Sequence, residues 1–219
     1  RGRCLLASLL SSLEAVSSVR TLTCEETSAR RIVLASASPR RSQLMQEIGL
    51  KFDVMPSQVA EGDISASCPE ELVMRLAHAK AADVAGRIQS GIVIGADTVV
   101  VAGGQILGKP VDLDDAAKML RALSGREHQV YSGVAVIDAE SGRSLIDYEA
   151  TAVRFRQLSE AAIQRYVATG EPMDKAGAYA IQGLGSLLVT GISGDYNCVV
   201  GLPLCRLAMM LSEFGVDTL

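Results

Sequence analysis

The sequence has few histidines, no cysteine pair with CxxC spacing and no long hydrophobic run. His78 and His128 are the only histidines and lie far apart, which argues against a histidine-rich metal site. The five cysteines are scattered and odd in number, which argues against a zinc knuckle or a disulfide framework. No apolar run approaches the roughly 18 residues of a membrane helix. These absences favour a reducing compartment and predict no membrane partner.

A positive net charge is also missing. The formal net charge is −4 and the pI is near 5.3. Because binding to a phosphate backbone needs a basic surface, we predict no nucleic-acid partner, and any anionic ligand would need a local basic pocket. With 219 residues, of which 48% are hydrophobic, the chain can form a sizeable core.

The first 30 residues differ in composition from the rest. They are rich in Arg, Ser, Thr and Leu, which is typical of an organellar transit peptide, although Glu14, Glu25 and Glu26 are atypical of one. A fragment start and a disordered extension are equally consistent with this composition. We expect an N-terminal extension over residues 1–30 and one domain over residues 31–219, in the cytoplasm unless the extension directs the chain to an organelle.

The stretch around residues 34–41 combines a strand, a helix start and two arginines. Residues 32–35 predict an apolar strand, and Ser38 is suited to cap a helix beginning at Pro39 by accepting a hydrogen bond from a backbone N–H. Arg40 and Arg41 would add two guanidinium groups to the positive end of the helix dipole, a combination that favours a polyanion. An ordinary capped helix with solvated arginines explains this segment equally well.

Hydrophobic periodicity predicts alternating strands and helices along the rest of the chain. Strands are expected at 52–55, 92–101, 106–107, 129–137, 144–155, 187–190 and 196–200, and helices at 39–49, 69–91, 112–125, 159–168 and 203–214. Residues 171–185 follow neither period and predict a loop and a short strand that line a site. There, Gln182 could read a base edge, because its amide offers both a donor and an acceptor.

Asp97 interrupts the otherwise apolar strand 92–101. A buried ionised carboxylate needs a cation, a metal or hydrogen-bond donors, which favours a functional role. Asp97 and Thr98 should point to opposite faces, so a shared ligand would require a bulge or a strand end. Lys80 lies on the apolar stripe of helix 69–91, where it either extends to the edge of the stripe or reaches an anion between helix and sheet.

The candidate site residues mix basic and acidic groups. They are Ser36, Arg40, Arg41, Lys80, Lys109 and Lys175, with the acids Glu61, Asp97 and Asp174. Basic groups bind phosphate oxygens, and carboxylates hold Mg²⁺ or Mn²⁺. The sequence lacks GxxxxGK[ST] and the kinase signature, and it shows no paired nucleophile and histidine. An activated water is therefore the expected nucleophile, in metal-assisted hydrolysis of a phosphoanhydride.

Four motifs occur in order along the chain, namely LASASPRR at 34–41, GADTV at 95–99, LGKP at 107–110 and DKAGAYAIQG at 174–183. Together they resemble the Maf family of nucleotide pyrophosphatases over roughly residues 31–215. The resemblance implies an α/β fold with a mixed twisted sheet flanked by helices and a central substrate cleft, like that of inosine triphosphate pyrophosphatase. It also implies a divalent metal and cleavage of a nucleoside triphosphate between the α and β phosphates, giving the monophosphate and pyrophosphate.

The resemblance also implies roles for individual residues. Asp97 becomes the proton acceptor for the attacking water and a metal ligand, and Glu61 lies near the metal. The positions near the phosphates are Ser36, Arg41, Lys80 and Lys109. The positions tied to substrate choice are Arg40, Thr98 and Gln182.

The motif at 174–183 is similar to the branch that acts on dTTP and UTP rather than on 7-methyl-GTP. Two alternatives stay open. One is a nucleotide-binding regulator of cell division without essential catalysis, and the other is a pyrophosphatase with a different base preference, such as 7-methyl-GTP. The expected partner is the nucleoside triphosphate, and the exposed length of the final helix suggests a homodimer surface.

Overall fold

The computed structural model describes residues 30–60, 62 and 64–218. Most of the expected N-terminal extension, together with Glu61, lies outside the described residues. The division of the chain into an extension and one domain therefore stays a prediction.

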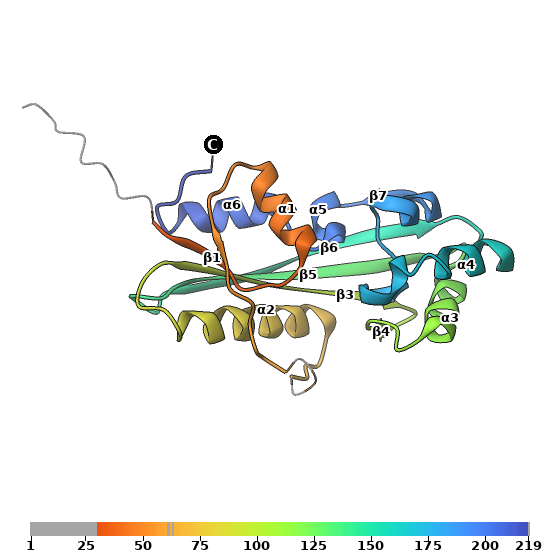
Figure 1. Ribbon diagram of the computed structural model, residues 1–219, viewed down its shortest axis with the longest axis horizontal. Coiled ribbons are helices and arrows are strands. Elements are labelled where there is room, and N and C mark those ends of the chain that lie inside the picture. Colours follow the sequence, from red (N-terminus) through yellow and green to blue (C-terminus); the bar gives the residue numbers. More distant parts are fainter. Residues whose placement is uncertain (1–29, 61, 63, 219) are drawn as a thin grey trace, which may run out of the picture.

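The described strands form a mixed seven-stranded sheet in the order β2-β1-β3-β5-β6-β7, with β4 paired to β3 (Figure 1). β1 is parallel to β2 and β3, and all other pairs are antiparallel. The strands are β1 (Ile32–Leu34), β2 (Asp53–Val54), β3 (Ile92–Ala102), β4 (Gln105–Leu107), β5 (Glu127–Asp138), β6 (Ser144–Phe155) and β7 (Val189–Ser193). The expected α/β fold with a mixed sheet and flanking helices is confirmed.

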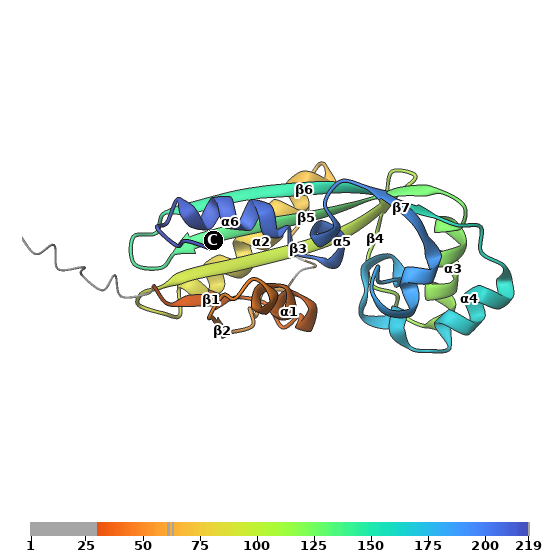
Figure 2. The same cartoon turned by 90° about the horizontal axis from the view of Figure 1, so that it is seen from above.

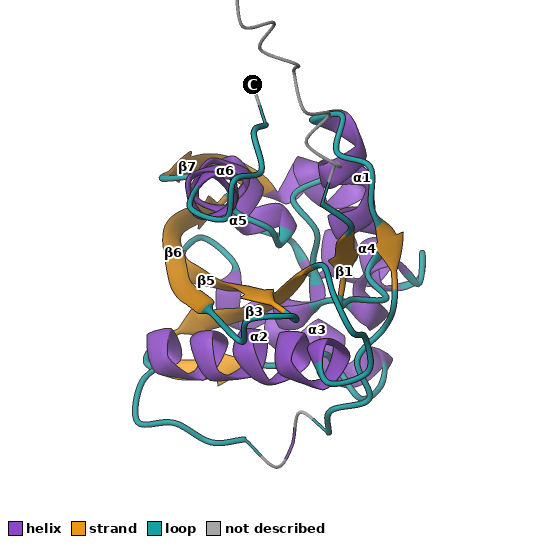
Figure 3. Cartoon of the chain, turned by 90° about the vertical axis from the view of Figure 1, so that its left-hand side faces the viewer, coloured by secondary structure: helices purple, strands orange, loops and turns teal. Residues whose placement is uncertain are grey.

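Helices cover both faces of the sheet (Figures 1 and 3). α2 (Pro69–Ala85) packs on one face, and α1 (Pro39–Glu47), α5 (Tyr196–Val200) and α6 (Leu204–Ser212) lie on the other. The nearly continuous apolar sequence of β3 follows from this arrangement, because a strand covered on both faces needs hydrophobic side chains on both. Two hydrophobic clusters result, one on each face.

A second group of helices lies at the far end of the long strands β3, β5 and β6 (Figure 2). It consists of α3 (Leu113–Leu123), α4 (Glu160–Val167) and three short 3-10 helices, η2 (Glu171–Asp174), η3 (Ala176–Ala178) and η4 (Gly183–Leu188). These elements share their own hydrophobic cluster with the ends of β5 and β6. The long strands thus connect two packed regions.

The helix boundaries test the predicted caps. Asp112 and Ser159 cap α3 and α4 by accepting hydrogen bonds from backbone N–H groups of their first turns. Ser38 occupies the N-cap of α1, but its side chain makes no cap hydrogen bond, so that prediction was wrong. Instead, the Ser38 N–H donates to the hydroxyl of Ser36 at 3.2 Å.

Three predicted elements differ from the structure. α2 ends at Ala85 rather than near residue 91, because the chain turns at Gly86. Residues 196–200 form a helix instead of a strand, because the Asp195 carboxylate accepts a hydrogen bond from the Asn197 N–H and thereby caps a helical turn. Residues 171–185 contain 3-10 helices and no strand.

Candidate active site

The cleft lies along an unpaired stretch of one edge of β3. On this edge β1 pairs with residues 92–94 and β4 pairs with residues 100–102, and no described strand pairs with the stretch between them. β5 occupies the opposite edge without interruption from 92 to 101. A cleft of about 610 Å³ opens at this gap. It has the size of a small-molecule site.

Residues from distant parts of the sequence line this cleft. Of the predicted site residues, the structure brings together Ser36, Arg40, Arg41, Lys80, Asp97, Thr98, Lys109, Asp174, Lys175 and Gln182. They come from the loop after β1, from α1, α2 and β3, from the loop after β4, and from the segment between η2 and η4. Only Glu61 cannot be placed, because it lies outside the described residues.

Asp97 and Thr98 both reach the cleft from a regular strand. Their pairing with Gly133 and Ser132 of β5 shows no shift in register, so the expected bulge or strand end is absent. The open strand edge explains the difference, because a ligand lying along an edge can contact side chains of both faces. Both residues line one cleft without a bulge, and their use by a single ligand stays a prediction.

Asp97 is paired with Lys80 across the interface between α2 and β3. The Lys80 ammonium donates to Asp97 Oδ1 at 2.6 Å, and the two side chains are only 11% and 9% exposed. Lys80 therefore reaches an anion between helix and sheet rather than extending to the edge of the apolar stripe. Removing either partner would leave the other charge buried without a counter-ion, which is strongly unfavourable.

Arg41 connects three elements on the other side of β3. Its guanidinium donates to the Gly201 carbonyl at 2.8 Å, to Ser36 Oγ at 3.0 Å and to Thr98 Oγ1 at 3.2 Å. The Gly201 carbonyl follows the C-terminus of α5, where a positive charge is favourable. These contacts fix the orientation of the guanidinium at the wall of the cleft.

Ser132 lies behind the cleft lining, where it contacts Thr98, and sequence reasoning missed it. It is fully buried on β5, donates to the Cys198 carbonyl at 2.7 Å and lies 2.8 Å from Thr98 Oγ1. Because the Ser132 hydrogen is committed to Cys198, the Thr98 hydroxyl must donate to Ser132 and accept from Arg41. Nothing in the sequence around Ser132 distinguishes it from an ordinary strand serine.

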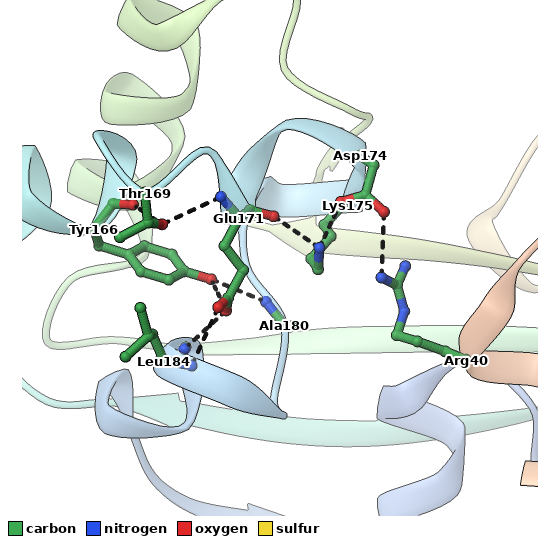
Figure 4. Close-up of polar contacts among 9 residues, drawn as sticks. Arg40, Tyr166, Thr169, Glu171, Asp174, Lys175, Ala180 and Leu184 are labelled. Carbon is green, nitrogen blue, oxygen red and sulfur yellow. Dashed lines mark hydrogen bonds and ion pairs between the residues drawn. The ribbon is translucent and has the colours of Figure 1, made fainter. Parts of the chain in front are cut away.

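Arg40 faces the opposite wall of the cleft, where it meets Asp174 (Figure 4). Arg40 Nη1 lies 3.4 Å from Asp174 Oδ2, and Lys175 donates to the other carboxylate oxygen of Asp174 and to the Glu171 carbonyl. Burial opposes ionisation of Asp174. The hydrogen bond from Lys175 and the charges of Lys175 and Arg40 outweigh it, so the pKa of this carboxyl lies below its usual value.

Lys109 and Gln182 lie on neighbouring segments of the same wall. The Gly177 N–H donates to the Gly108 carbonyl at 3.0 Å and joins these two segments. Within the described part of the chain, neither side chain makes a hydrogen bond or an ion pair. Both polar groups are therefore available to a ligand.

The side chains of the cleft suit a divalent metal ion only when a bound ligand supplies further oxygen atoms. Among the described residues, no group of three or more His, Cys, Asp or Glu could hold a metal ion. Asp97 supplies one buried carboxylate beside the basic groups. Mg²⁺ is commonly held by one or two carboxylates, substrate phosphates and water, so this donor set fits a cation that arrives with a triphosphate.

The mixed sheet and its cleft define the class of the protein. It is an α/β protein whose cleft brings several positively charged side chains and a carboxylate to one unpaired strand edge, an arrangement suited to a phosphorylated small molecule. The family model described as Maf-like protein matches residues 31–214, and the chain belongs to this family. No described helix is long and apolar enough to span a membrane.

Curated relatives cover most of the chain. A dTTP/UTP pyrophosphatase of Pelotomaculum thermopropionicum is 53% identical over 190 residues, which span 87% of this chain and 100% of the relative. The dTTP/UTP pyrophosphatase of Moorella thermoacetica is 52% identical over 85% of this chain and 96% of its own length. That of Syntrophotalea carbinolica is 50% identical over 84% of each chain.

Proposed function

We propose that this protein is a dTTP/UTP pyrophosphatase. It hydrolyses the nucleoside triphosphate between the α and β phosphates and releases the monophosphate and pyrophosphate. One observation carries the proposal. The Lys80–Asp97 pair and the Arg41 cluster meet at the open edge of β3, in a chain about half identical to relatives of that name.

The phosphate chain binds to the basic side of the cleft. Arg41 is already oriented by Gly201, Ser36 and Thr98, so its binding of a phosphate oxygen costs little side-chain entropy. Lys109 adds a positive charge from the facing loop. Together these groups neutralise charge that develops on the phosphate oxygens during bond cleavage.

Asp97 accepts the proton of the attacking water. It is the acidic group that reaches the cleft from the buried part of the sheet, and Lys80 keeps its carboxylate in one position. A positioned carboxylate of this kind typically contributes a factor of about 10² to 10⁴ as a general base. When bound, Mg²⁺ or Mn²⁺ would polarise the phosphoryl oxygens, with Asp97 and Glu61 as its protein ligands.

The base is read at the opposite wall. Gln182 offers a donor and an acceptor, which match the carbonyl and N–H groups that thymine and uracil present side by side. Arg40 and Thr98 complete the set tied to substrate choice. A cytoplasmic location and a homodimer are further expectations from the sequence.

A substrate panel tests the proposed function. Purified protein is incubated with Mg²⁺ and dTTP, UTP or 7-methyl-GTP, and pyrophosphate release is measured. We expect release from dTTP and UTP that exceeds release from 7-methyl-GTP and that stops when a chelator removes the metal. Release only from 7-methyl-GTP would establish the other base preference, and no metal-dependent release from any of the three would refute the enzyme.

A further inference from the structure

Glu171 does not line the cleft, yet its carboxylate holds the backbone that follows Gln182. Glu171 Oε2 accepts a hydrogen bond from the Leu184 N–H at 3.2 Å, and Oε1 accepts one from the Gly185 N–H at 3.0 Å. Both donors belong to the first turn of η4, whose N–H groups have no partner within the helix itself. The Glu171 carboxylate therefore caps η4 from a distant segment.

Tyr166 extends this hydrogen-bond network to the other side of Gln182 (Figure 4). Its hydroxyl donates to Glu171 Oε1 at 2.9 Å and accepts from the Ala180 N–H at 3.3 Å. Burial, together with the hydrogen bond to Glu171, raises the pKa of Tyr166 far above its ordinary value. The phenol thus stays protonated and keeps its donor role.

The segment between these anchors has little room to move. A Cβ on Gly185 would lie 2.1 Å from the Ala180 carbonyl and 2.7 Å from the Tyr166 hydroxyl, so the backbone at Gly185 packs closely against Ala180 and Tyr166. Gly183 has a φ of +63°, which a residue with a side chain rarely adopts. Gln182 lies inside this closed loop and faces the cleft from it.

We propose that Glu171, supported by Tyr166, is a positioning residue that sets base selectivity by holding Gln182 against the cleft. The proposal rests on the function proposed above. An amide can distinguish one base edge from another only when its donor and acceptor are held within a fraction of an ångström. Fixing the backbone on both sides of Gln182 provides that precision.

The substitution E171Q tests this role. The glutamine keeps the size of the side chain but replaces one acceptor oxygen with an NH₂ group that cannot accept from a backbone N–H. We measure kcat and KM for dTTP and for dCTP, whose base presents a different pattern of donors and acceptors. The selectivity ratio of the two kcat/KM values should fall by about tenfold, the equivalent of one hydrogen bond to the base.

The loss of selectivity in E171Q should appear mainly as a higher KM for dTTP, because the base contact is made equally in the ground state and the transition state. The matched control is E160Q, which removes the charge and one of the two acceptor oxygens that Glu160 offers to Arg121, in the same region but outside the cleft. Its selectivity ratio should equal that of the wild type. If E171Q is poorly folded by circular dichroism, Tyr166→Phe provides the same test with the same expected result.

A double variant separates positioning from a general loss of structure. In the background Gln182→Ala, E171Q should cause no further loss of selectivity, because the two changes act through the same contact. An equal additional loss in that background, or an unchanged ratio in E171Q alone, would overturn the proposal. A normal ratio in Gln182→Ala would also overturn it while leaving the pyrophosphatase intact, whereas failure of the wild type to hydrolyse dTTP would refute the enzyme itself.

Discussion

At the scale of single residues, the central feature is the buried charge pair formed by Lys80 and Asp97. The sequence identified both residues as unusual, because each places a charge on an apolar surface. It could not show that they meet, since the contact joins a helix and a strand 17 residues apart through tertiary packing. Structure was needed to choose between the two interpretations of Lys80.

Replacing Lys80 with methionine should destabilise the fold by about 3 kcal/mol, because the Asp97 carboxylate would stay buried without its partner. Urea denaturation measures this loss, and pyrophosphate release should fall as well. The double variant with Asp97→Leu should recover most of the stability, since no lone charge remains, but no activity. If Lys80→Met alone is as stable as the wild type, the pair does not offset the burial of its charges.

At the scale of elements, α2 lies close to the sheet where Lys80 meets β3. Two glycines make this approach possible. A Cβ on Gly95 would lie 2.2 Å from the Ala77 carbonyl, and one on Gly133 would lie 2.3 Å from the Val73 carbonyl. The helix therefore rests directly on the backbone of β3 and β5.

Gly95→Ala should push α2 away from β3 and cost about 2 kcal/mol or more of stability, because backbone atoms stand where the methyl group would go. Activity should fall further than stability alone explains, because the Lys80–Asp97 contact opens. Gly86→Ala is the control, since its Cβ would meet only ordinary contacts, at 3.5 Å or more. Thermal unfolding and pyrophosphate release of the two variants are compared, and equal behaviour would show that the close approach is not required.

Helices and strands were predicted correctly where the hydrophobic periodicity was strong. The predictions failed where an element was short. The long strands β3, β5 and β6 and the capped helices α3 and α4 were predicted correctly. The pattern Tyr-Asn-Cys-Val-Val at 196–200 favours a strand locally, but the cap at Asp195 and the packing of α5 against the sheet override that preference. This error matters for the site, because the end of α5 supplies the Gly201 carbonyl that holds Arg41.

At the scale of the whole molecule, the cleft is a product of topology. It exists because β1 and β4 pair with different parts of the same edge of β3 and leave a gap between them. Pairing between strands distant in sequence decides this gap, and no local pattern encodes it. The four sequence motifs nevertheless supply most of the residues that line it.

The stability of the whole fold should depend on pH through His128, which lies outside the cleft lining. Burial lowers its pKa from 6.5 to about 4, its Nε2 pairs with the Tyr179 hydroxyl, and its Nδ1 has no partner in the described part of the chain. Between these two values the unfolded chain binds a proton that the folded chain does not. Stability is therefore retained above pH 6.5 and falls as the pH drops toward 4.

Denaturation of the wild type should show a loss of about 2 kcal/mol between about pH 7 and pH 5 from this residue. The variant His128→Phe keeps an aromatic ring between Phe155 and Tyr179 but has no group to protonate. The stability of His128→Phe should decline by about 2 kcal/mol less than that of the wild type over the same pH range. Identical pH dependence of the two proteins would assign the decline to other groups.

The central claim is that Asp97 activates the water while the basic groups bind the triphosphate. The most direct measurement compares wild type and Asp97→Asn for pyrophosphate release from dTTP and for the Kd of dTTP, both with Mg²⁺. We expect release to fall by a factor of about 10² to 10⁴, with Kd changed by no more than a few fold. Pyrophosphate release near the wild-type rate in Asp97→Asn would contradict this account.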